Sequence, residues 1–349
     1  MLKHQPPFTM TESAFHVVPW NVQLSYQSFQ SELSKIEQES SSQELINNVL
    51  RFLIFTSGAI ECQLVLFPPN KTESLFPITN AYTVSLENGK TVSVPKNNGT
   101  VYLSLEEVVR DETFGNIGKV SFNSLPGYRY HQTKYSMQIV KNFFVQLYRQ
   151  LFFQNNAGNL RQAYLQMLFQ IANRIDNNRF HMKSHGSHTA KLAKSIAHQM
   201  GCNPEQSMMI YYAGVFHDIG KIIIPDTILN KPAPLDHEEW HVVRNHPTFG
   251  ASLFEPLFDL HNLIPIIRGH HEWVDGTGYP DNLSGEQIPS GARILSVADA
   301  YSTMIDGRTY QHKKSPAQAK KEMVRCKDSQ FDAHIVDALL SILPKAFSY

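Results

Sequence analysis

Apolar residues recur three and four positions apart over several long stretches of the chain, a pattern that predicts amphipathic helices. The first such stretch covers residues 41–57, where Ser41 and Glu44 form a capping box and Gly58 is expected to end the helix. Its predicted apolar face consists of Ile46, Val49, Leu50, Leu53 and Ile54. A second helix is expected to begin near Thr133, and another follows the break "NNAG" at 155–158.

Strand signals separate the first two of these helices. Residues 60–67 and 117–123 are short apolar runs, and residues 82–94 read as a hairpin whose turn is Asn88-Gly89. This order predicts an α+β module in residues 1–153, which loosely resembles a GAF-type sensor domain. A scaffold or dimerisation domain is the alternative. Residues 154–180 are expected to form a connecting helix, either a stalk that supports a homodimer or an ordinary core helix.

The second half of the chain, residues 181–349, reads as helical throughout. Helices are expected at 185–200, after the cap Asn203 with Pro204 at the first position, and after the cap Asp236. Two further helices are expected at 264–272 and 293–304. The predicted fold class is therefore a multidomain chain, with an α+β module followed by an all-α domain.

Bulk composition narrows the classes of function. Lys+Arg and Asp+Glu both number 31, so no global positive field attracts DNA or an anionic membrane. The sequence has no apolar run of about 18 residues, so we expect no membrane span. The three cysteines are far apart and lack metal-type spacing, which favours a reducing, cytoplasmic location.

Histidine is concentrated in one part of the chain. Eleven of the sixteen histidines fall between His181 and His271. Several of them, together with two aspartates, end or interrupt an apolar helix; these residues are His185, His217, Asp218, His246, His270, His271 and Asp299. Seven ligands exceed the need of one ion, so Asp218 is expected to bridge two ions. Nitrogen and oxygen ligation without thiolate suits iron or manganese, with zinc as an option. Such a pair of ions holds a bridging hydroxide and polarises a phosphoryl oxygen, and both effects promote phosphoester hydrolysis.

The motifs around these ligands resemble one family closely. "FHDIGK", "NHPTFGASLF", "GHHEWVDGTGYPDNLSGEQIPSGARILSVADAY" and "DGRTY" are similar in order and wording to the HD-GYP family, over about residues 180–340. The resemblance implies an all-α HD-type phosphohydrolase domain. It also implies hydrolysis of the bacterial messenger cyclic di-GMP to linear pGpG, and in some members to GMP, by a metal-bridging hydroxide that attacks phosphorus.

The resemblance assigns roles to individual residues. It makes the same seven residues the metal ligands: His185, His217, Asp218, His246, His270, His271 and Asp299. Asp218 and Lys221 are the implied catalytic residues, with Lys221 at the reacting phosphate or protonating the leaving oxygen. Gly278, Tyr279 and Pro280 border the substrate, and this loop can dock a diguanylate cyclase or other signalling proteins. Lys221 and Arg308 are the implied phosphate contacts.

Two positions depart from the family pattern. His181 stands where some members have a glutamate that helps to hold a third metal, so a dinuclear centre is expected. Gln311 stands where many members have a second basic residue, "RPYR" or "RPYK", which weakens the expected hold on a substrate phosphate. Two readings follow: an active cyclic di-GMP phosphodiesterase, or a weakly active or inactive module that senses cyclic di-GMP or docks signalling partners.

Overall fold

The computed structural model describes residues 42–57, 59, 61–66, 81–87, 90–92, 103–112, 115–124, 133–153, 158–177, 185–307 and 313–343. The chain divides into two units, Met1–Lys35 and Ile36–Tyr349, and every described residue lies in the second. The predicted domain boundaries at 153 and 180 stay predictions. The predicted cap Ser41, the helix stop Gly58 and the turn Asn88-Gly89 lie outside the described residues.

An antiparallel sheet follows the first described helix, α2 (Ser42–Ser57). Within the described residues it has five strands in the order β3-β2-β1-β5-β4. The strands are β1 (Glu61–Leu66), β2 (Ala81–Glu87), β3 (Lys90–Val92), β4 (Leu103–Asp111) and β5 (Gly115–Ser124). The sheet confirms the predicted α+β character and the pairing of β2 with β3. The GAF-type resemblance stays a prediction.

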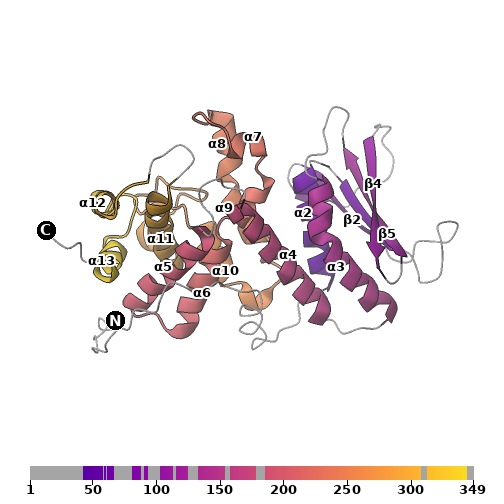
Figure 1. Ribbon diagram of the computed structural model, residues 1–349, viewed down its shortest axis with the longest axis horizontal. Helices are drawn as coiled ribbons and strands as arrows, with labels where there is room; N and C mark the ends of the chain where they lie inside the picture. Colours follow the sequence, from indigo (N-terminus) through magenta and orange to yellow (C-terminus); the bar gives the residue numbers. More distant parts are fainter. Residues whose placement is uncertain are drawn as a thin grey trace, which may run out of the picture. The chain divides into compact units, whose positions relative to one another are not determined.

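Helices α2 and α3 (Thr133–Phe153) lie on the same side of the sheet (Figure 1). The predicted apolar face of α2 is buried, with Val49 and Leu53 fully inaccessible. Phe52, on another side of the helix, is also inaccessible, because α2 contacts both the sheet and the helical half of the chain. A helix covered on several sides does not show the single apolar stripe that its spacing predicts.

The rest of the described chain is helical, as predicted for residues 181–349. Its longer helices are α4 (Gly158–Asn177), α5 (His185–Gln199), α6 (Pro204–Phe216), α8 (His237–Arg244), α9 (His246–Ser252), α10 (Leu263–Arg268), α11 (Ser290–Asp306), α12 (Pro316–Arg325) and α13 (Ala333–Ile342). Short turns of helix lie between them: η1 (Ile219–Ile223), α7 (Asp226–Leu229), η2 (Phe258–Leu260) and η3 (Gly285–Gln287). The predicted caps Asn203 and Asp236 are confirmed, and each forms a capping box. No helix among the described residues is long and apolar enough to cross a bilayer.

Two glycines allow the helices of this half to approach closely. A Cβ atom on Gly214 of α6 would lie 2.6 Å from the Cα of Ala190 in α5. A Cβ atom on Gly220 of η1 would lie 1.9 Å from the carbonyl oxygen of His246 and 2.7 Å from the amide nitrogen of Gly250 in α9. Backbone therefore touches backbone at both crossings, and only glycine fits.

A buried polar cluster joins α2 and α4 to the chain after α9. The Tyr164 hydroxyl donates to the Leu253 carbonyl at 2.7 Å, and the Asn48 amide donates to the Ser252 carbonyl at 3.0 Å. Tyr164 is inaccessible to solvent and Asn48 is 6% exposed. Burial raises the pKa of Tyr164, so its hydroxyl keeps its proton and acts as the donor. These bonds bring side-chain donors to carbonyls at the C-terminal end of α9, where a helix lacks donors of its own.

We expect Tyr164→Phe to lower the free energy of unfolding by about 1–3 kcal/mol, because it leaves a buried carbonyl without its donor. Denaturant unfolding followed by circular dichroism measures the change. Tyr301→Phe is the matched control, since the buried Tyr301 forms no hydrogen bond with any other described side chain or backbone group. Equal losses in the two variants would contradict the role given to the Tyr164 bond.

We expect Gly220→Ala to destabilise the protein by about 1–3 kcal/mol or more, because the added methyl group meets backbone that cannot rotate away. Gly291→Ala is the matched control. Its methyl group would meet the end of the flexible Ile266 side chain, at 2.8 Å from Cδ1. Thermal unfolding should rank Gly220→Ala well below Gly291→Ala, and the reverse order would refute the close approach of η1 to α9.

Candidate metal centre

Three of the predicted ligands follow the ends of helices, and their rings share one hydrogen-bond arrangement. His217 follows α6, and His246 and His270 follow within two residues of α8 and α10. Each ring Nδ1 contacts the carbonyl oxygen of the residue three positions earlier; these are Gly214 at 2.8 Å, Val243 at 2.8 Å and Ile267 at 2.6 Å. A carbonyl only accepts, so Nδ1 carries a proton, and in the neutral ring Nε2 keeps its lone pair.

The Nε2 atoms of His217, His246 and His270 are the chemically available groups of this cluster. All three are buried and have no hydrogen-bond partner among the described residues. A buried polar atom without a partner is costly, and a cation removes that cost. The ends of α6, α8 and α10 also bring partial negative charge to the same place. The donor set therefore fits metal ions.

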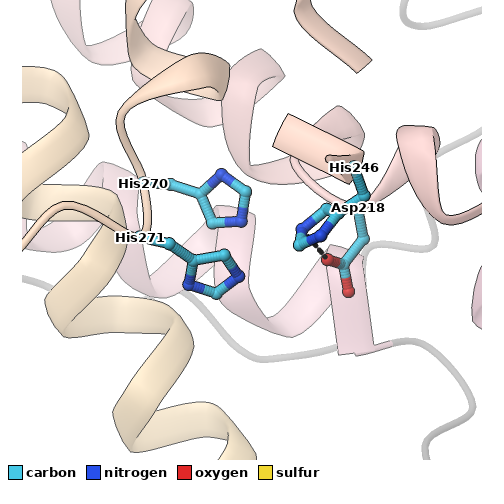
Figure 2. Close-up of side chains that lie close together, drawn as sticks. All are labelled: Asp218, His246, His270 and His271. Atoms are coloured by element: carbon cyan, nitrogen blue, oxygen red, sulfur yellow. Dashed lines mark ion pairs between the residues drawn. The ribbon is translucent and has the colours of Figure 1, made fainter. Parts of the chain in front are cut away.

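The carboxylate of Asp218 lies between two groups of ligands. Asp218 groups with His185 and His217 on one side, and with His246, His270 and His271 on the other. Its Oδ2 lies 3.4 Å from Nε2 of His217, and its Oδ1 lies 3.4 Å from Nε2 of His246. Figure 2 shows the second group, with the rings of His270 and His271 across from His246 and Asp218. Each oxygen thus serves a different group, which is the arrangement of a bridging carboxylate.

Helices α5 and α11 complete the first group. His185 is the first residue of α5, and its Nε2 lies 2.9 Å from Oδ1 of Asp299 in α11. The same oxygen lies 3.6 Å from Nε2 of His217 and accepts a hydrogen bond from the Thr303 hydroxyl at 3.4 Å. Asp306, two turns further along α11, lies 3.5 Å from Nδ1 of His185. A carboxylate on the far nitrogen of a ligand histidine fixes the ring and its tautomer.

Burial and charge divide the histidines into two kinds. Burial lowers the pKa of His270 to about 3, and its neighbours His217 and His246 add to the effect. Burial also lowers the pKa of His246 and of His271, so these rings are neutral and offer lone pairs. For His185, hydrogen bonds to the two carboxylates of α11 outweigh burial and raise the pKa to about 9. A metal ion at His185 therefore competes with a proton.

The loop after His271 is built onto the ligand segment. The amide of Tyr279 donates to the His271 carbonyl at 3.1 Å, and the two rings lie 4.8 Å apart. A Cβ atom on Gly278 would lie 2.3 Å from the amide nitrogen of Trp273, so only glycine fits there. The buried Glu272 carboxylate accepts from the amides of residues 281 and 283, at 2.6 and 3.0 Å. The loop is thereby held against His270 and His271.

Lys221 lies directly beside the shared carboxylate. Its Nζ is 2.5 Å from Oδ1 of Asp218, one turn earlier along the same segment, and its side chain is 12% exposed. An ammonium group in this position balances part of the buried negative charge and holds a proton next to the predicted metal centre.

The structure thus brings together all seven predicted ligands, and places Lys221, Gly278 and Tyr279 around them. Pro280 follows in the same loop, after a cis peptide bond. Arg308, Gln311 and His181 lie outside the described residues, so their predicted roles stay predictions.

Three carboxylates next to the centre were not predicted. Asp306 has a sequence signal, because it lies seven residues after Asp299, on the same face of α11. Glu272 follows the histidine pair directly, but nothing in its spacing shows that it binds the loop. Asp176 of α4 accepts two bonds, both 3.1 Å, from the Gly186 amide at the start of α5, beside His185. This contact joins residues of different helices and leaves no local pattern.

Known proteins resemble this half of the chain. Residues 170–335 match the family described as HD domain. A cyclic di-GMP phosphodiesterase response regulator, RpfG, of Xanthomonas campestris is 38% identical, over 44% of this chain and 40% of that protein. A cyclic di-GMP phosphodiesterase of Thermotoga maritima is 32% identical, over 52% of this chain and 50% of that protein. A 3'3'-cGAMP-specific phosphodiesterase of Vibrio cholerae is 30% identical, over 53% of this chain and 36% of that protein.

The chain spans half or less of the length of these curated relatives. The matched segment nevertheless includes every described ligand and the complete order of motifs around them. On this evidence residues 170–335 belong to the HD-GYP family of HD-domain proteins.

Proposed function

We propose that this protein is a metal-dependent phosphodiesterase that hydrolyses cyclic di-GMP to linear pGpG, with GMP as the product of a second hydrolysis. The observation that carries the proposal is the position of Asp218 between two groups of histidines. A shared carboxylate between two ligand groups is what two adjacent ions require, and paired ions serve phosphoester hydrolysis.

The residues that would hold the ions are the seven named above. His185, His217 and Asp299 would serve one ion; His246, His270 and His271 would serve the other, and Asp218 would serve both. When bound, the ions supply Lewis-acid polarisation of the phosphoryl oxygen and activation of water. Iron or manganese suits this oxygen and nitrogen donor set, and zinc is a further option.

The chain itself supplies orientation and a proton. Nδ1–H bonds to helix-end carbonyls fix the rings of His217, His246 and His270, so their Nε2 lone pairs need no reorganisation. The oxygen of water bonds to phosphorus, the bond from phosphorus to the ribose oxygen breaks, and that oxygen takes up a proton while the attacking water gives one up. The ammonium of Lys221, 2.5 Å from Oδ1 of Asp218, would supply this proton.

The nature of the relatives supports a cyclic dinucleotide as substrate. Two of those described above are named for cyclic di-GMP and one for 3'3'-cGAMP. Cyclic di-GMP is the substrate proposed here, since the quoted motifs are those of the HD-GYP family. The loop with Gly278, Tyr279 and Pro280 would border it, and Arg308 would contact a phosphate.

We expect protein loaded with iron or manganese to convert cyclic di-GMP to pGpG, and protein treated with a chelator to lose this activity. Separation of the products by chromatography, with cyclic di-AMP and 3'3'-cGAMP run in parallel, measures both conversion and preference. Binding of cyclic di-GMP without cleavage, under every metal loading, would contradict the proposal and identify a binding module.

We expect Asp218→Ala to lose most of its bound metal, because the carboxylate serves both ions, whereas the unmodified chain binds two. Elemental analysis of purified protein gives the count. Asp226→Ala is the matched control, since Asp226 is an exposed aspartate a few residues further on. Metal content in Asp218→Ala equal to that of the control would show that Asp218 is not a shared ligand.

A further inference from the structure

One basic residue at the edge of the metal centre has no role in the account above. Arg244 is the last residue of α8, an exposed helix with no buried side chain. It directly follows Val243, whose carbonyl accepts the Nδ1–H of His246 at 2.8 Å. The backbone of Arg244 is therefore fixed relative to a predicted metal ligand.

The side chain of Arg244 is directed toward the loop at the centre. Its guanidinium carbon lies 5.5 Å from the ring centroid of Tyr279. His271 also lies beside that ring, with the ring planes tilted by 34°. A guanidinium within about 6 Å of an aromatic face is held by a cation–π interaction. Arg244, Tyr279 and His271 thus form a row that leads from solvent to the metal centre.

Arg244 has no ion-pair partner among the described residues. Other cations of this region have carboxylate partners: Lys221 pairs with Asp218, Lys231 with Glu239, and Arg268 with Asp281. No carboxylate among the described residues lies within ion-pair distance of Arg244, whose one recorded contact is the Tyr279 ring. Its N–H donors remain available to a ligand.

We propose that Arg244 binds the second phosphate of the substrate, the one that is not being hydrolysed. This inference rests on the proposed function. A cyclic dinucleotide has two negatively charged phosphodiester groups. When one of them lies at the metal ions, the other lies outside the ligand cluster. The planar guanidinium offers two parallel donors to a phosphate, and Tyr279 holds it one side chain away from His271. At Gln311, where many family members have a second base, this chain has no charge.

The test compares substrates that have two phosphodiester groups with a substrate that has only one. Metal-loaded full-length protein and its Arg244→Ala variant are assayed with cyclic di-GMP, cyclic di-AMP and bis(p-nitrophenyl) phosphate. We expect Arg244→Ala to raise KM for both cyclic dinucleotides about tenfold or more, with kcat changed by less than about twofold. Where turnover is slow, Kd from calorimetry replaces KM. Activity on the single diester should stay unchanged, and Arg244→Lys should restore part of the affinity.

Arg325→Ala is the matched control, because Arg325 is an exposed arginine at the end of another helix. If Arg244→Ala has the same KM values as Arg325→Ala, the inference is overturned. An equal loss of activity on all three substrates would place Arg244 at the metal centre and would also overturn the inference. A loss of affinity confined to cyclic di-GMP would overturn it too, because it would identify a contact to guanine instead of phosphate. Failure of the unmodified protein to bind or cleave any cyclic dinucleotide would refute the proposed function, and this inference with it.

Discussion

The buried carboxylate of Asp218 is the constraint around which the helical half of the chain is arranged. At 6% exposure, an isolated negative charge would be very costly, so every neighbouring group must compensate it. Lys221 does so at 2.5 Å from Oδ1, whereas the Nε2 atoms of His217 and His246 face one oxygen each at 3.4 Å, an arrangement that a bound cation would complete. Because these partners come from different helices, the carboxylate can have its partners only when the helices have their observed packing.

The C-terminal ends of three helices orient the rings of His217, His246 and His270. A helix leaves its last carbonyls without partners, and three histidines predicted to be ligands bind those carbonyls through Nδ1, which fixes the orientation of the ring. The same ends carry partial negative charge, which favours cations at the point where they meet. One feature of secondary structure thus satisfies the backbone, selects Nε2 as the coordinating atom and favours metal binding.

Local patterns were enough to predict most of the helices, the caps Asn203 and Asp236 and the sheet hairpin, because each depends on neighbours within a few residues. Strand β4 was missed: Glu106, Glu107 and Arg110 obscure its apolar alternation, and an edge strand tolerates such charges. The extra burial of Phe52 was missed for a different reason, since it depends on contacts between distant segments. At the centre, the ligands could be named from motifs, whereas the contact of Asp176 with Gly186 leaves no signal in sequence.

The two sides of the centre are supported in different ways. The side with Asp218 and His246 depends on backbone contact between η1 and α9 at Gly220, behind which Tyr164 and Asn48 bind the carbonyls after α9. The side with His270 and His271 depends on a loop, which the Glu272 carboxylate holds through two amides. Helices packed backbone to backbone resist displacement more than a loop does. The loop side, where Tyr279 is half-buried, is therefore the part of the centre that can adjust more easily to the proposed substrate.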